Sequence, residues 1–378
     1  MLSVGDATFK ILGIGLLALS LAACGADGPP PPTGYKYYAY VANTLDDAVS
    51  AFSLDPDTGA LTPAATIALK ANLQPHSLAV TPSGKFAYVA GSYYTSVYAY
   101  SIDAATGAWN GVPGTPFSPG VHPSGMTIDP SGRYLYVAGY DDAAVAALRI
   151  NADTGRLTVV PGSPFPVAGG PFKIAVEPKG KFAYVLGADA ATVTALAIDG
   201  TTGALTVLGG PVGVGTEPQS LTIDPEGRRL YVPSFDINSK AISAFAIDAA
   251  TGALTAVPGS PFAVPQPPPY MLFPEEVAVE PSGRFAYAIC LGSMTMTYFD
   301  IDAVTGALTP SAAVTSIWNS PRAIVVGPTG RHIYVTYSTA PGNLTIHEID
   351  PGSGAVFLDN VMTTGNYPSA LVTVRIAQ

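Results

Sequence analysis

The sequence predicts an all-β fold, a seven-bladed β-propeller of four-stranded blades that is closed by pairing of the N- and C-terminal strands. The main observation is a repeat, because a glycine followed by an aromatic and apolar stretch recurs at a spacing of about 48 residues. Self-similarity at such a period is typical of propellers and solenoids. The copies lie at 34–41, 84–89, 132–137, 180–185, 227–232, 283–288 and 330–335.

Each repeat divides into four short strands, named a to d in chain order. In the second repeat, strand a is predicted at 77–80, strand b at 86–90 and strand c at 96–102, followed by a short strand d. Strands of about five residues, with their turns, each fill a quarter of the repeat. A glycine that tolerates positive φ is predicted in each a–b turn and each c–d turn.

Two kinds of proline-rich segment are predicted between strands d and a. The repeated Pro-Gly-Ser-Pro-Phe at 161–165 and 258–262 is predicted to be a d–a turn with a packed aromatic ring. The segment at 265–273 lengthens the same connection in a later repeat, and its consecutive prolines predict a stiff, extended excursion.

Strand b is apolar at consecutive positions, as in the Phe-Ala-Tyr-Val-Ala of 86–90. A strand that neighbouring sheets cover on both faces requires this pattern. The C-terminal segment 367–374 matches a strand a with no strand b after it, whereas the N-terminal copy begins at strand b. Pairing these ends in one blade removes open sheet edges. Residues 35–378 are therefore predicted to form one propeller domain.

The N-terminal residues are predicted to be targeting and linker sequence. A charged start, an apolar run and small residues before Cys24 are typical of a secretory signal. The Leu-Ala-Ala-Cys of 21–24 resembles the lipobox of bacterial lipoproteins, which implies a signal peptide at 1–23 and a lipid on Cys24. Residues 24–34 are then a proline-rich tether. Gly25 after the cysteine favours an outer-membrane location, on the periplasmic or surface face.

Two motifs recur along the chain from Tyr35 onward. One is a proline-led strand a followed by P-x-G-(K/R)-x-x-Y-V, as at 75–89 and 123–137, and the other is the V-S-A-F-S-L-D-P-D-T-G-A-L-T of 49–62. Together they resemble the seven-bladed lactonase-like propellers, a family that includes bacterial 6-phosphogluconolactonases and fungal muconate-cyclising enzymes, and the similar YVTN-type surface propellers. These are turn and core residues, so the resemblance implies fold more strongly than activity.

The lactonase members imply a catalytic constellation that this sequence keeps only in part. In them, Pro-Arg-His segments enter strand a and an Asn-Glu pair leaves strand b. Here Arg322 is kept but Ala323 stands at the histidine position, and Asn43 is followed by Thr44. His76 lies one place early in its own repeat.

Function is predicted at the channel mouth that the b–c and d–a loops form, because loops on a rigid scaffold carry binding groups. Residues that open strand a in different repeats would supply a base, cations and carboxylates there. The candidate catalytic residues are His76, Arg322, Glu275 and Glu276, and the candidate ligand-binding residues are Lys173, Gln219, Asp141 and Asp142. The alternative interpretation is that these side chains are solvated charges of the rim.

The charge pattern disfavours several partners. The formal net charge is −10, and the predicted mouth loops carry acidic residues against few cations. A sugar phosphate would be repelled there, and nucleic acid finds no basic stripe to follow. The four histidines have no zinc-site spacing, so no metal or cofactor is predicted. Cys290 lies in an apolar strand and is predicted to be an inert buried thiol.

Two functions from different classes remain open. The first is a lipid-anchored envelope propeller that binds a protein, peptide or glycan at its acidic mouth without catalysis. The second is a lactonase in which His76 or a mouth carboxylate activates water and Arg322 or Lys173 stabilises the oxyanion. The first is favoured, because the catalytic constellation is incomplete and an envelope location separates the protein from cytoplasmic sugar phosphates. In both cases we expect a monomer, held at the membrane through Cys24.

Overall fold

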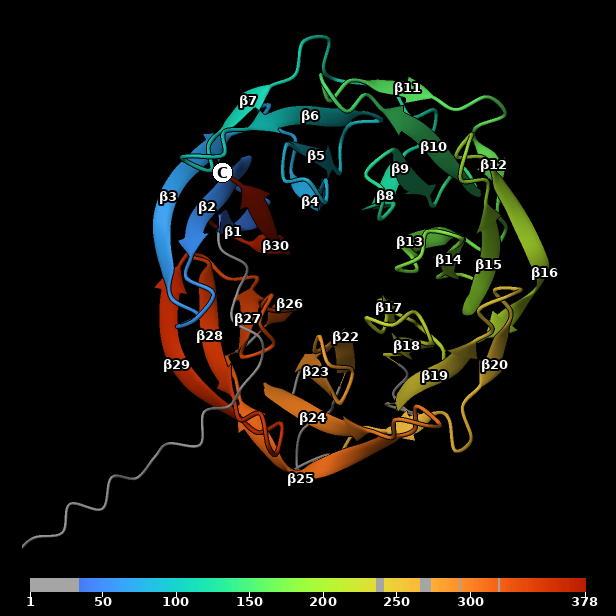
Figure 1. The fold of residues 1–378 in the computed structure, drawn as a ribbon, viewed down its shortest axis with the longest axis vertical. Helices are drawn as coiled ribbons and strands as arrows, with labels where there is room; N and C mark the ends of the chain where they lie inside the picture. Colours follow the sequence, from blue (N-terminus) through green and yellow to red (C-terminus); the bar gives the residue numbers. More distant parts are fainter. Residues whose placement is uncertain (1–33, 236–240, 266–272, 292–293, 319) are drawn as a thin grey trace, which may run out of the picture.

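Seven sheets stand around a central channel in the part of the chain that the computed structural model describes (Figure 1). The described residues are 34–235, 241–265, 273–291, 294–318 and 320–378. The predicted all-β, seven-bladed propeller is confirmed. The predicted signal peptide, Cys24, the tether up to residue 33 and most of the proline-rich segment 265–273 lie outside the described residues. Within those residues, no helix has the length and apolarity that a membrane span needs.

The two inner strands of each blade are strand a, which faces the channel, and strand b behind it (Figure 1). The strands a, from blade 1 to blade 7, are β30 (Pro368–Ala377), β4 (Pro75–Val80), β8 (Pro123–Ile128), β13 (Pro171–Val176), β17 (Thr222–Ile223), β22 (Phe273–Val279) and β26 (Pro321–Val326). The strands b are β1 (Tyr35–Asn43), β5 (Phe86–Gly91), β9 (Tyr134–Gly139), β14 (Phe182–Gly187), β18 (Arg229–Pro233), β23 (Phe285–Leu291) and β27 (His332–Tyr337).

The two outer strands, c and d, complete each blade. The strands c are β2 (Ala48–Leu54), β6 (Val97–Ile102), β10 (Ala144–Ile150), β15 (Thr192–Ile198), β19 (Ala241–Ile247), β24 (Thr295–Ile301) and β28 (Asn343–Ile349). The strands d are β3 (Leu61–Ala68), β7 (Trp109–Gly111), β11 (Leu157–Val159) with β12 (Phe165–Pro166), β16 (Leu205–Gly213), β20 (Leu254–Ala256) with β21 (Phe262–Ala263), β25 (Leu308–Ser316) and β29 (Val356–Thr363).

Blade 1 closes the ring with strands from both ends of the chain. β1 pairs antiparallel with β30 from Tyr35 opposite Ala377 to Asn43 opposite Pro368, and β1 also pairs with β2. The C-terminal strand therefore supplies strand a to the blade whose other three strands come first in the sequence. The predicted closure is confirmed, and it leaves no unpaired inner edge at the junction.

The repeated Pro-Gly-Ser-Pro-Phe segments lie inside strand d, so their prediction as d–a turns was wrong. In blade 3 the chain leaves β10 after Val159 and returns to it at Phe165, which pairs with Val145. Blade 5 repeats this geometry with β20 and β21 on β19. The Phe165 ring packs against the core between blades, so burying it brings the chain back to the sheet.

A belt of tyrosine–glycine hydrogen bonds joins neighbouring blades. In each blade a buried tyrosine of strand b donates its hydroxyl to the carbonyl of the c–d turn glycine in the next blade, over 2.9 to 3.3 Å. The pairs of this Tyr–Gly belt are Tyr40–Gly107, Tyr88–Gly155, Tyr136–Gly203, Tyr184–Gly252, Tyr231–Gly306, Tyr287–Gly354 and Tyr334–Gly59. The two most repeated motifs of the sequence are thus partners across the blade interfaces.

The c–d turn glycines satisfy two requirements at once. Gly155 has a φ of 71°, which favours glycine. A Cβ at this position would also overlap the ring of Phe86, the first residue of strand b in blade 2. The turn itself is held by its first side chain: in blade 2, Asp103 Oδ1 accepts the N–H groups of Ala105 and Thr106 at 3.1 and 2.8 Å. These contacts fix where each blade packs on the next.

Candidate functional site

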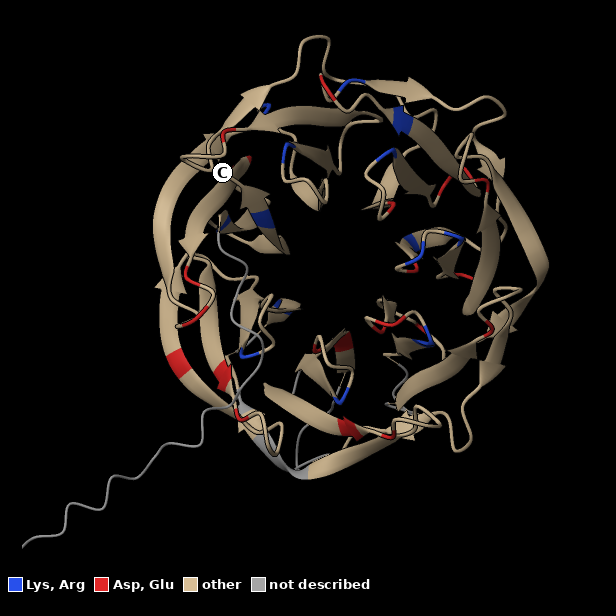
Figure 2. Cartoon of the chain, in the orientation of Figure 1, with Lys and Arg blue, Asp and Glu red and all other residues tan. Residues whose placement is uncertain are grey.

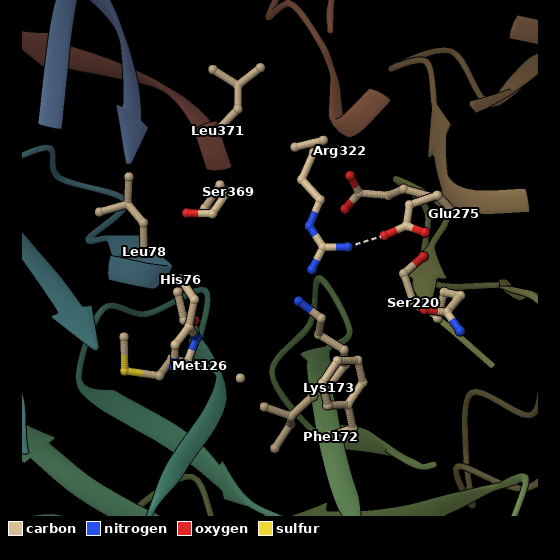
Figure 3. A pocket seen from close by; sticks show the side chains of 17 residues that line it. His76, Leu78, Met126, Phe172, Lys173, Ser220, Glu275, Arg322, Ser369 and Leu371 are labelled. Carbon is tan, nitrogen blue, oxygen red and sulfur yellow. Dashed lines mark hydrogen bonds and ion pairs between the residues drawn. The ribbon is translucent and has the colours of Figure 1, made fainter. Parts of the chain in front are cut away.

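The channel contains a cavity of about 190 Å³ at the end where the strands a begin, and every blade contributes to its wall (Figure 3). The lining residues are His76, Ser77, Leu78, Gly125, Met126, Phe172, Lys173, Ile174, Gln219, Ser220, Glu275, Glu276, Arg322, Ala323, Ser369, Ala370 and Leu371. A cavity of this kind can hold a small molecule.

A β-bulge at the start of strand a points consecutive side chains into the cavity. In blade 2 the pairing with β5 skips His76, which lies between the paired residues Pro75 and Ser77. The same shift follows the first proline of β8, β13 and β26 and the proline of β22. A bulge sets two residues opposite one. Adjacent residues such as Glu275 and Glu276 therefore both line the cavity.

One wall of the cavity is charged. Arg322 and Glu275 form an ion pair between blades 7 and 6 (Figure 3). The Glu275 side chain is 9% exposed and the Arg322 side chain is 47% exposed. The second carboxylate, Glu276, accepts the backbone N–H of Ile324, with 2.9 Å between Oε2 and N. Both glutamates of blade 6 are thus held by blade 7.

Lys173 extends from blade 4 toward this wall (Figure 3). Gly125 of blade 3 makes room for it, because a Cβ there would lie 2.6 Å from the Phe172 carbonyl oxygen and 3.4 Å from Lys173 Cδ. Burial lowers the pKa of Lys173, and the carboxylate of Glu276 opposes that shift. Burial also raises the pKa of Glu276, opposed by Lys173. Desolvation thus moves the pKa values of both groups toward neutral pH.

His76 lines the opposite side of the cavity, next to Met126 (Figure 3). Burial lowers the pKa of His76 to about 4, and the positive charges of Lys173 and Arg322 add to that shift. The imidazole is therefore neutral at pH 7. A neutral ring nitrogen can accept a proton from water.

The family model of the 7-bladed β-propeller lactonases matches residues 33–172, 163–273 and 273–372. The matches together span nearly all of the described propeller. This chain belongs to the lactonase family of seven-bladed β-propellers. Comparison with curated proteins gives no match.

Several solved structures share the fold of this lactonase-family propeller. The periplasmic gluconolactonase of Pseudomonas aeruginosa is 20% identical with a TM-score of 0.73, over 90% of this chain and 99% of that one. A putative 6-phosphogluconolactonase of Bacteroides uniformis is 16% identical with a TM-score of 0.75, over 90% and 99% of the two chains. Another from Bacteroides fragilis is 18% identical with a TM-score of 0.74, over 92% and 100%. At these identities the similarity establishes the fold alone.

Six of the eight candidate residues of this lactonase-family propeller line the same cavity. They are His76, Lys173, Gln219, Glu275, Glu276 and Arg322. Five of them lie on a strand a, and Gln219 lies in the segment that leads into β17. Figure 2 shows charges of both signs distributed around the ring.

Asp141 and Asp142 are not among the residues that line the cavity, so the structure does not join them to this site. They lie in the b–c loop between β9 and β10, outside the ring of strands a. Asp142 Oδ2 accepts the backbone N–H of His122 at 2.6 Å and lies 3.4 Å from the Nδ1 atom of that histidine. Its carboxylate thereby holds the loop that enters strand a of the same blade.

Other mouth carboxylates have the same structural use. Asp47 accepts the backbone N–H groups of Asn72 and Gln74 at 2.6 and 2.7 Å. Asp46 accepts the backbone N–H of Asn366 at 2.6 Å and its side-chain amide at 2.8 Å. These acidic groups therefore fix the d–a loops at the mouth.

Sequence reasoning missed the aliphatic part of the cavity wall. Leu78, Met126, Ile174 and Leu371 line it, each three residues after the proline that opens strand a. Alternation along a strand places residues two apart on the same face. Counted from His76, that period would have found Leu78, but no candidate polar residue lies two positions before Met126, Ile174 or Leu371.

Cys290 is free and fully buried, as predicted. Burial raises the pKa of its thiol to about 12, which keeps it protonated. Among the described residues, no group of three or more His, Cys, Asp or Glu side chains is placed to hold a metal ion.

Proposed function

We propose that this propeller hydrolyses a ring ester in the central cavity. The observation that carries the proposal is the convergence of a neutral histidine, a lysine, an arginine and two glutamates from four blades on one small cavity. Membership in the lactonase family and the lactonase names of similar structures support the reaction class. A cavity of about 190 Å³ also fits a small ring better than a polymer.

In the proposed reaction, His76 accepts a proton from a water molecule whose oxygen attacks the ester carbonyl carbon. The carbonyl oxygen becomes an oxyanion that faces the Lys173 ammonium, with Arg322 beside it. The bond between the carbonyl carbon and the ring oxygen then breaks. The ring oxygen takes a proton from the imidazolium, and the product is an open hydroxy acid.

Purified mature protein tested against five- and six-membered lactones provides the test. We expect turnover above background and a loss of about 100- to 1,000-fold in kcat/KM for His76→Ala and for Lys173→Met. Asp141→Asn is the control, because Asp141 lies outside the cavity. Absence of turnover on the whole panel, or turnover that both cavity variants leave intact, would reject the proposal.

We further propose that the protein is lipid-anchored in the cell envelope, with Cys24 acylated and the outer membrane as its location. The lipobox-like sequence at 21–24 is the support. One similar structure is named a periplasmic enzyme, which agrees with an envelope location. Metabolic labelling with a fatty acid should mark the wild-type protein and not Cys24→Ala, which should leave the membrane fraction. Equal labelling of both proteins would contradict the anchor.

A second candidate function is binding of a protein, peptide or glycan at the mouth, without catalysis. Exposed aromatic residues favour it: Tyr93, Trp318 and Tyr367 are 70%, 43% and 42% exposed, and all lie in b–c or d–a connections at the mouth. Crosslinking of the anchored protein in native membranes should retain a partner that Tyr93→Ala and Trp318→Ala release. Recovery of the protein alone, as a monomer, would count against this candidate.

A further inference from the structure

The wall of the central cavity has two chemically different halves (Figure 3). Three adjacent blades, 1 to 3, present what we call the aliphatic half, in which Leu371, Leu78 and Met126 lie beside the polar residues His76, Ser77 and Ser369. The charged half comes from blades 4, 6 and 7 and consists of Lys173, Glu275, Glu276 and Arg322. A small molecule bound between the halves would contact hydrocarbon on one side and charges on the other.

The aliphatic half is open to the cavity, unlike its counterparts across the ring. Leu78, Met126 and Leu371 are only partly buried, whereas Val277 and Ile324 occupy the same strand position in blades 6 and 7 and are 2% and 4% exposed. Val277 and Ile324 do not line the cavity. The three open side chains therefore offer apolar surface that a ligand can cover.

The charged half has no surplus positive charge. Arg322 is paired with Glu275, and Glu276 is the main electrostatic partner of Lys173. Two cations thus face two carboxylates. Phosphate and sulfate groups need cations that are free to pair with them. This balance favours a neutral carbonyl group over an anionic substituent.

A polyhydroxylated ring fits the aliphatic half poorly. Hydroxyl groups placed against Leu78, Met126 and Leu371 would lose water without gaining hydrogen bonds from these three side chains, and the Ser369 hydroxyl is already donated to the Pro75 carbonyl oxygen at 2.6 Å. An alkyl or aryl group in the same place gains free energy from burial, because each buried methylene strengthens binding about fourfold.

We propose that the substrate is a neutral ring ester with an apolar substituent, whose carbonyl group faces Lys173 and whose substituent covers Leu78, Met126 and Leu371. This proposal rests on the proposed lactone hydrolysis and names its substrate class.

The experiment compares δ-valerolactone, δ-decalactone, which adds a pentyl chain, and D-glucono-δ-lactone as substrates of the wild-type protein. If two or three methylenes are buried, kcat/KM should be roughly 15- to 60-fold higher for δ-decalactone than for δ-valerolactone. D-glucono-δ-lactone should be the poorest substrate. A separate titration by calorimetry uses the unsubstituted and pentyl-substituted δ-lactams, so that binding is measured without hydrolysis.

The variants test where the pentyl chain of the substrate lies. Leu78→Asn and Leu371→Asn should each reduce the ratio between the two lactones, because they replace hydrocarbon with an amide that has the same number of side-chain heavy atoms. Leu45→Asn is the matched control, since Leu45 is 56% exposed in a mouth loop and should leave the ratio unchanged. Met126→Gln provides a second probe if either leucine variant fails to fold, as judged by its melting temperature.

The outcomes separate the two proposals. Preference for D-glucono-δ-lactone, or a lactone ratio that Leu78→Asn, Leu371→Asn and Met126→Gln all leave unchanged, overturns the apolar-substituent proposal while lactone hydrolysis stands. Tighter binding of the pentyl lactam without turnover of any lactone supports the apolar half and rejects hydrolysis. If no lactone is hydrolysed and no lactam is bound, both proposals fail.

Discussion

The Tyr–Gly belt and the central cavity use the sevenfold repeat in opposite ways. In the belt, each blade supplies the same donor and acceptor to its neighbours. At the cavity, the residue after the strand-a proline differs among most blades and includes His76, Phe172, Glu275 and Arg322. Repeated positions thus hold the fold, and divergent positions carry the chemistry.

The location of each region explains this difference. A belt contact joins two neighbouring blades, so one solution serves every interface. The cavity lies on the ring axis, where all blades meet. Seven identical lysines there would repel one another in a poorly hydrated space. Divergence of the blades is therefore the condition for a site that combines a base, cations and carboxylates.

The largest expected effect comes from breaking the belt at Gly155. Gly155→Ala imposes a positive φ on alanine and drives its Cβ into the Phe86 ring. Together these should reduce the free energy of unfolding by about 2–5 kcal/mol. Gly283→Ala is the control, because Gly283 has the same φ of 71° but nothing within 4 Å of its added Cβ. It should cost only about 1–2 kcal/mol in urea denaturation. Equal losses of unfolding free energy in Gly155→Ala and Gly283→Ala would contradict the packing of Gly155 against Phe86.

The cavity and the core of blade 7 each hold a neutral histidine, which predicts acid sensitivity. His347 lies in the wall of blade 7, with Nε2 2.8 Å from Thr345 Oγ1, and burial lowers its pKa to about 4. The unfolded state therefore binds more protons than the folded state between about pH 6.5 and 4, and stability falls as the pH falls through that window. The slope is up to about 1.4 kcal/mol per pH unit for each such histidine. The same direction holds for His76.

Denaturation at several pH values tests this expectation. His347→Gln should flatten the dependence of unfolding free energy on pH in that window, and adding His76→Gln should flatten it further. A slope that neither variant changes would assign the acid sensitivity to other groups.

Gly125→Ala should affect the cavity more than the scaffold. The added Cβ would lie 2.6 Å from the Phe172 carbonyl oxygen and would press on the Lys173 stem. We expect a stability loss of about 1–3 kcal/mol and a drop in kcat/KM. Because Gly125 acts through Lys173, the drop should be much smaller in a Lys173→Met background. Gly200→Ala is the control, since nothing lies within 4 Å of its added Cβ. An equal drop in kcat/KM in the wild-type and Lys173→Met backgrounds would show that Gly125 does not act through Lys173.

The fold was predictable because its determinants repeat. The glycines of both turns and the closing strand follow from the period, and strand b, predicted at 86–90, is observed at Phe86–Gly91. Strand a was predicted to begin at Ser77 but begins at Pro75, and this difference conceals the bulge at His76. Bulges depend on pairing between strands, which no single segment encodes.

The cavity was predictable only in its polar half. Polar residues after a repeated proline stand out from the pattern, but Leu78 and Leu371 match the aliphatic residues that pack between blades. Whether such a residue faces the axis or the core depends on the tilt of its blade. Asp142 is the opposite case, a polar residue that was predicted for the site but holds a loop instead. Its carboxylate accepts a loop N–H, and that contact depends on loop geometry.

The smallest expected effect comes from removing one belt hydroxyl. Tyr88→Phe leaves the Gly155 carbonyl without its 2.9 Å donor and should cost about 0.5–1.5 kcal/mol. Tyr184→Phe, two blades away, should cost a similar amount, and the double variant should show the sum, since distant sites act independently. Neither should change kcat/KM for any lactone, because the belt does not line the cavity. Strongly unequal costs, or a double variant far from the sum, would mean that the ring transmits strain between blades and that belt and cavity are energetically coupled.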